Sequence, residues 1–227
     1  MNQGTKPLLL SLAVTFLSLA AGLVSYGALR SAEESQQLVL GTIPKHPVTY
    51  VIKNHQGSSE CSGSLDMSID TGNNQAFVLL RGWMLVSAFG KPETVTVDGS
   101  LVFNALGQLS ASVFRTFSRQ ESIRFGTMGV NPITAQLYNT PDGTAPLFEQ
   151  TLPGPIELKP REGRYELVAP QYRNVIAPLQ HISLPVALEV AAKDSCPKET
   201  AQPIDLTSLL HMAASLSDKV RKVLPAL

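Results

Sequence analysis

The sequence has little charge and no excess of either sign. Charged residues make up 16% of its 227 residues, and 18 basic side chains balance 18 acidic ones, so the formal net charge is zero. A protein that binds nucleic acid usually carries a basic patch or stripe that neutralises phosphate groups. We therefore expect no nucleic-acid partner.

The motifs of metal sites and of nucleophilic enzymes are also missing. The four histidines, His46, His55, His181 and His211, are far apart, and the sequence has no H-E-x-x-H or C-x-x-C motif. It has no G-x-S-x-G elbow for a nucleophilic serine and no G-x-x-x-x-G-K-S/T loop for phosphate. We therefore predict a protein that is not an enzyme, with no metal, no cofactor and no catalytic residue.

Cysteine is scarce. The two cysteines, Cys61 and Cys196, are distant from each other, and neither has the spacing of a metal ligand. A single distant pair fits an exported domain with one disulfide, whereas two buried thiols in a reducing compartment are the alternative. We predict a Cys61–Cys196 disulfide.

Charge is absent altogether from residues 7–29, PLLLSLAVTFLSLAAGLVSYGAL. At about 1.5 Å per helical residue, this run is long enough to cross a hydrocarbon core of about 30 Å. It predicts a retained signal anchor over residues 1–30, with a cleaved signal peptide as the alternative. We expect a cell-envelope protein whose bulk is exported to the periplasm or the exterior, secreted if the segment is cleaved.

Alternation of apolar and polar residues dominates the chain after residues 31–47, a predicted linker that contains Pro44 and Pro47. A period of two predicts strands with one buried face. Such alternation occurs at 63–69, 133–139, 156–159, 164–168 and 181–190. Pro185 indicates that the last of these lies at a sheet edge or carries a bulge.

Residues 75–89 differ because they are apolar on both faces, which predicts a central strand with a bulge at Gly82. Turns are predicted at Asp98-Gly99, Asp142-Gly143 and Glu162-Gly163. Short strands separated by turns, without alternating helices, indicate a mainly β domain over residues 48–196. We expect an antiparallel β-sandwich or a partly open barrel.

Residues 197–227 are predicted to be a tether followed by an amphipathic helix. Asp205 provides an N-terminal cap and Pro225 prevents extension. The helical stripe, with a period of three to four residues, includes Leu206, Leu209, Leu210, Leu216, Val220 and Leu224. Because residues 191–203 are polar and contain proline, we expect the stripe to contact a protein partner or the membrane surface. Packing on its own sheet is the alternative.

The triplet Asp70-Thr71-Gly72 resembles the catalytic triplet of pepsin-like and retroviral-type aspartic peptidases. Those enzymes need two aspartates that share one proton, and this sequence has no second triplet, so a peptidase would have to be a dimer. Asn73 and Asn74 follow Gly72, and strand-like runs lie on both sides. The turn chemistry therefore favours a hairpin.

Arginine and phenylalanine alternate in residues 113–126, VFRTFSRQESIRFG. Arg115, Arg119 and Arg124 form a candidate site for an anionic ligand or an acidic partner, because guanidinium groups bind phosphate and carboxylate in a planar fork. The alternative is a hairpin whose charges are merely solvated. Altogether we expect a membrane-anchored protein with a binding or assembly role. A carrier or bridge for an apolar ligand such as lipid and a dimeric aspartic peptidase are the alternatives.

Overall fold

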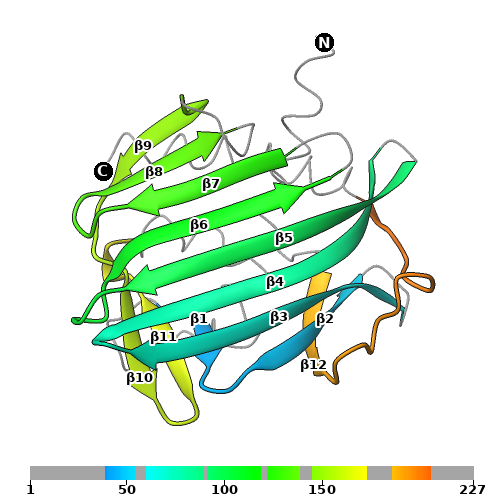
Figure 1. Cartoon of the computed structure of the whole chain (residues 1–227), viewed down its shortest axis with the longest axis horizontal. Coiled ribbons are helices and arrows are strands. Elements are labelled where there is room, and N and C mark those ends of the chain that lie inside the picture. The colour runs from blue at the N-terminus through cyan, green and yellow to red at the C-terminus, as the bar shows by residue number, and fades with distance from the viewer. Residues whose placement is uncertain are drawn as a thin grey trace.

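The computed structural model describes residues 39–205, apart from 55–59, 89–90, 119–121, 139–144 and 173–185 (Figure 1). The described residues form two sheets, and every strand pair is antiparallel except the short pair β13–β4. The prediction of a mainly β, antiparallel fold is confirmed, and the arrangement is consistent with the sandwich. The predicted anchor and the predicted amphipathic helix lie outside the described residues.

The large sheet has ten strands in the order β12-β2-β3-β4-β5-β6-β7-β8-β9, with β13 beside β4. Strands β2 to β9 pair in sequence order, each with the next, as Figure 1 shows. The edge position of β12 agrees with the prediction made from Pro185. The strands are β2 (Val48–Asn54), β3 (Cys61–Gly72), β4 (Gln75–Ala88), β5 (Lys91–Phe103), β6 (Leu109–Phe117), β7 (Ser122–Met128), β8 (Ile133–Tyr138), β9 (Phe148–Leu152), β12 (Val186–Ala191) and β13 (Ile204–Asp205).

The small sheet has three strands in the order β1-β11-β10 and lies at one corner of the large sheet (Figure 1). These strands are β1 (Val39–Pro44), β10 (Glu157–Arg161) and β11 (Arg164–Val168), and a short 3₁₀ helix, η1 (Pro170–Tyr172), follows β11. Residues 39–44 of the predicted linker therefore belong to the fold. Pro44 and Pro47 suggested a linker, but the neighbouring Ile43 is fully buried.

The first apolar cluster lies between the two sheets. Ile43, Leu158 and Leu167 of the small sheet pack on side chains from β2 to β6 of the large sheet. We call the face of the large sheet that carries Leu80 and Phe114 the inner face, and the opposite one the outer face. The first cluster fills only the part of the inner face next to the small sheet.

A second apolar cluster lies farther along the inner face. It consists of Ile52, Met84, Val86, Val95, Val97, Val186 and Ile204. Strand register places all of them on the same side of the large sheet as Leu80. Each is at most 5% exposed. No residue of the small sheet belongs to this cluster.

Two predictions about glycine are wrong. Asp98 and Gly99 do not form a turn, because they lie in the middle of β5, where a Cβ on Gly99 would come within 2.6 Å of the Phe114 ring. Gly82 is not at a bulge, because the pairing of β4 with β5 runs without a register shift. A side chain at Gly82 would overlap the Ser64 carbonyl. Both glycines allow close packing inside strands.

Candidate binding surface on the outer face

The Asp70 triplet is the end of a strand. Asp70 is exposed and pairs with Phe77 across the β3–β4 hairpin, whose turn is formed by Asn73 and Asn74. Both asparagines have positive φ, 53° and 59°. This geometry suits a two-residue hairpin turn. The hairpin prediction is correct, although the turn follows Asp70 by three residues. In the described part of the chain, no three His, Cys, Asp or Glu residues are grouped as a metal site would need.

A charged row crosses the outer face at right angles to the strands. Arg81 Nε lies 3.4 Å from Asp98 Oδ1, and Thr49 Oγ1 donates a 2.6 Å hydrogen bond to Asp66 Oδ1. Cross-strand pairing from β3 to β8 brings together Asp66, Arg81, Asp98, Arg115, Arg124 and Tyr138. The row alternates in sign until Arg115 and Arg124, where two cations are neighbours.

This pair of arginines is the part of the predicted anion site that the structure brings together. Arg115 on β6 is paired directly with Arg124 on β7, and the Arg124 guanidinium lies 4.1 Å from the centroid of the Tyr138 ring. Arg119 lies outside the described residues. Like charges opposite each other weaken a sheet, whereas an anion placed between them would remove the repulsion. The arrangement can therefore hold a carboxylate or a phosphate.

An apolar patch lies beside the charged row on the same face. Phe77 is 38% exposed, Leu79 is 42% exposed and Met128 is 62% exposed. The patch comprises Phe77, Leu79, Val102, Ala111, Val113 and Met128, which cross-strand pairing places side by side on β4 to β7. The sequence analysis missed this patch. Its signal was the apolar run 75–89, which we interpreted only as a central strand with apolar residues on both faces.

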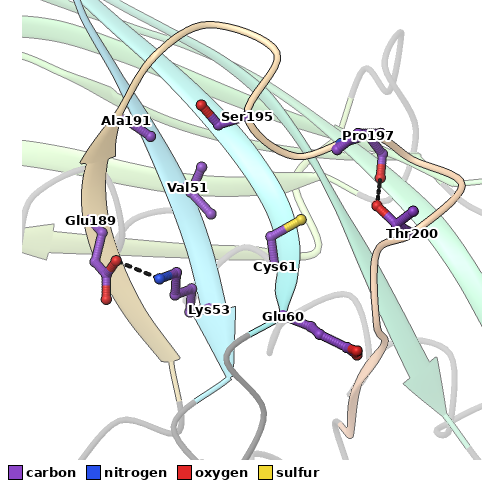
Figure 2. Close-up of a pocket in the computed structure, with 9 residues that line it drawn as sticks. All are labelled: Val51, Lys53, Glu60, Cys61, Glu189, Ala191, Ser195, Pro197 and Thr200. Atoms are coloured by element: carbon purple, nitrogen blue, oxygen red, sulfur yellow. Dashed lines mark hydrogen bonds and ion pairs between the residues drawn. The ribbon is translucent and has the colours of Figure 1, made fainter.

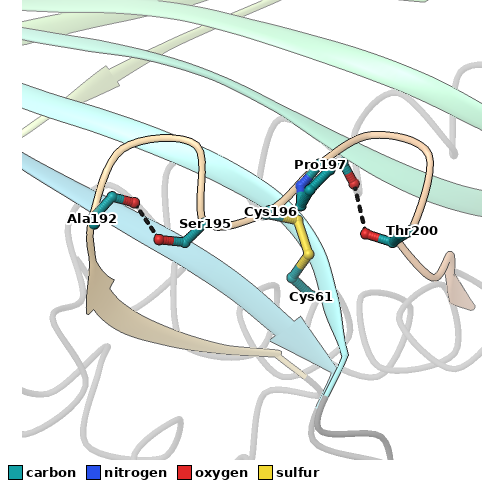
Figure 3. The surroundings of a disulfide bond; sticks show 6 residues. All are labelled: Cys61, Ala192, Ser195, Cys196, Pro197 and Thr200. Carbon is teal, nitrogen blue, oxygen red and sulfur yellow. Dashed lines mark hydrogen bonds between the residues drawn. A yellow bond between two sulfur atoms is a disulfide. The ribbon is translucent and has the colours of Figure 1, made fainter.

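The predicted disulfide between Cys61 and Cys196 is confirmed, with a Cα–Cα distance of 5.8 Å. It fixes a strap, residues 192–203, against the outer face beside β2 to β4 (Figure 3). The Gln202 amide donates a 2.9 Å hydrogen bond to the Cys61 carbonyl, and Lys198 Nζ lies 5.4 Å from the centroid of the Trp83 ring. The predicted tether is thus part of the fold, because its apolar Ala201 and its cysteine are buried.

A pocket of about 410 Å³ lies between this strap and β12 (Figure 2). It contains an ion pair in which Lys53 Nζ lies 2.6 Å from Glu189 Oε2. Its lining residues are Val51, Lys53, Glu60, Cys61, Glu189, Ala191, Ser195, Pro197 and Thr200. Because charged side chains stand in its wall, this pocket is a poor site for a wholly apolar ligand such as lipid.

Glu166 is a buried carboxylate on the small sheet, away from the outer face. Its Oε2 accepts a 2.9 Å hydrogen bond from Arg161 Nε, and its Oε1 accepts a 3.3 Å hydrogen bond from Arg164 Nη2. Burial alone would raise the pKa of Glu166, but these two arginines outweigh it and lower the pKa below its usual value of 4.5. A general acid needs the opposite shift, so this cluster is an ion-pair network of the β10–β11 hairpin.

No protein-family model, curated protein or solved structure matches this chain. Within the parts of residues 39–205 that the structure describes, no helix has both the length and the apolar character needed to cross a membrane. The predicted anchor, residues 1–30, lies outside those parts. Its role stays a prediction, as do the predictions of location and partner.

Proposed function

We propose that this protein is a non-catalytic binding or assembly protein of a cell envelope. Residues 1–30 hold it at a membrane, and the outer face of the large sheet binds a protein partner. The observation that carries the proposal is the exposed apolar patch beside the charged row. Soluble domains rarely leave a contiguous apolar surface open unless something binds there.

The shape of this surface supports a protein as the partner. Ligand sites for small molecules are concave and enclose most of the ligand. The patch instead spreads over four adjacent strands, β4 to β7, and its side chains stand on the open face of a sheet. An extended surface of this kind suits the apolar centre and polar rim of a protein interface.

The charges next to the patch indicate which charged group the partner carries. Arg115 is exposed and forms no ion pair with any other described residue. The Arg81–Asp98 pair is already formed within the protein. A partner with apolar side chains and an adjacent carboxylate would fill the patch and pair with Arg115, a combination of apolar anchor and charged rim.

In vivo photo-crosslinking tests the surface. A photoreactive residue at position 79 should yield a discrete product with a partner, whereas one at Thr94, exposed on the same face but outside the patch, should not. The Phe77→Ser and Arg115→Glu substitutions should each reduce the product at least about tenfold, as expected for interface anchors worth about 1.4 kcal/mol or more. Equal yields at positions 79 and 94 would contradict the proposal.

The membrane attachment has a separate test. Intact-mass analysis of protein from its native host should find residues 7–29 still present, because their length suits a spanning anchor. A mature N-terminus near Leu23 or Ala28 would show instead that a signal peptide is removed. That result would leave the proposed binding surface unaffected.

A further inference from the structure

The second cluster needs a cover that the described strands do not supply. Its seven residues belong to β2, β4, β5, β12 and β13, all strands of the large sheet. Neighbouring side chains on one face of a sheet shield each other's flanks, but their tips are buried only by another layer about 10 Å away. The small sheet contributes no residue to this cluster, so the described strands alone do not account for its exposure of at most 5%.

The chain itself reaches this cluster at β13. Ile204 pairs with Val86, Asp205 pairs with Ser87, and the Ile204 side chain is 1% exposed within the second cluster. β3 leaves this edge of β4 open, because its pairing with β4 ends at Met84. The last described residue, Asp205, therefore lies at the margin of the second cluster.

The strap leaves the chain little freedom before that point. Cys196 is bonded to Cys61, Gln202 is hydrogen-bonded to the Cys61 carbonyl, and Ala201 is buried. A free tether would have let the following segment reach a distant partner. The observed path instead brings the chain to the edge of β4, where Ile204 joins the second cluster.

We propose that residues 206–227 form an amphipathic helix that covers the second cluster with its leucine stripe. A helix over residues 206–224 is about 28 Å long at about 1.5 Å per residue. Four strand spacings of about 4.8 Å span about 19 Å, so this helix is long enough to cross from β12 to β5, the strands over which the second cluster extends. Of the two destinations predicted from the sequence, the inner face of its own sheet is the one the structure favours.

Thiol labelling of the full-length protein in detergent tests this inference. One parent carries Val97→Cys in the second cluster, and a second parent carries Val78→Cys in the first cluster, with the native disulfide intact. The stripe variant combines Leu209→Asn with Leu216→Asn. The matched control combines Ser208→Asn with Ser215→Asn on the opposite side of the helix. Maleimide labelling rates under native conditions report local exposure.

In the stripe variant, labelling at position 97 should rise about tenfold or more, and labelling at position 78 should stay near its parent rate. The control should change neither. If labelling rises at both positions in the stripe variant alone, the inference also holds, because an external stripe would leave both thiols protected. A rise of less than about twofold at position 97, or an equal rise in the control, would overturn it. The outer-face proposal does not depend on this result.

Discussion

Alternate residues of β4 have similar side chains and different surroundings. On the inner face, Val78 and Leu80 are 0% and 2% exposed, whereas on the outer face Phe77 and Leu79 are 38% and 42% exposed. Hydrophobicity alone therefore does not determine which face of this strand is buried. The second layer decides it, and the small sheet lies on one side only.

The outer face itself is divided in the same way. At one end, the strap packs on Val51, Trp83 and Leu85 and forms a third apolar cluster with Cys196 and Ala201. At the other end, the apolar patch has no such cover among the described residues. The same strands thus show a covered apolar surface and an open one, and the open one is where we place the partner.

Removing the disulfide is the strongest test of the covered end. Cys61→Ser combined with Cys196→Ser should lower the free energy of unfolding by about 4–5 kcal/mol, because the bond closes a loop of 135 residues. Urea denaturation of the oxidised parent and the double variant measures the difference. Reduction of the parent without substitution is the control. A loss below about 1 kcal/mol would contradict the estimate that this bond stabilises the fold by closing a long loop.

Truncating one leucine on each face of β4 compares the two faces directly. Leu80→Ala should cost about 2–5 kcal/mol, since it leaves a cavity in the first cluster. Leu79→Ala should cost about 1 kcal/mol or less, because that side chain is already 42% exposed. Thermal denaturation of both variants measures the ratio. Similar losses would show that the outer face is covered in the intact protein.

A substitution at Glu166 tests the stability of the small sheet, which covers part of the inner face. Glu166→Gln should destabilise the protein at pH 7 by about 1.5 kcal/mol, at the low end for charged hydrogen bonds because both arginines are about half exposed. The pKa of Glu166 is lowered on folding, so its contribution is complete above 4.5 and is lost as pH falls through the lowered value.

Urea denaturation from pH 7 to pH 2 should therefore show the Glu166→Gln variant and the parent converging in acid. Glu162→Gln in the adjacent turn is the matched control, because Glu162 is exposed. A difference between Glu166→Gln and the parent that stays constant across this range would mean that the carboxylate is not held ionised by Arg161 and Arg164.

Much of the sheet was predictable because alternation is a local signal. The predicted strand at 164–168 is β11, and Leu65 and Met67 are buried as their spacing indicates. Gly99 was misread because its role depends on Phe114, which lies on the neighbouring strand. Likewise β1 was missed, because it pairs with a strand more than a hundred residues later and Ile43 is buried only where the two sheets pack together.

The candidate surface was only half predictable. Arg115 and Arg124 attracted attention through their spacing, and hairpin pairing does bring them together. The patch around Leu79 was not predicted, because a strand that is apolar on both faces gives no sign of which face is covered by a second layer. Which face is covered depends on where the small sheet and the strap pack on the large sheet.

The meander of the large sheet also sets an order of assembly. Strands β2 to β9 pair with their sequence neighbours, so each can join the sheet by a local hairpin contact with the strand before it. The pairings of β12 with β2 and of β13 with β4 join distant parts of the chain. The Cys61–Cys196 bond likewise joins positions 135 residues apart, so it adds a long-range link to a sheet whose other neighbours are mostly local.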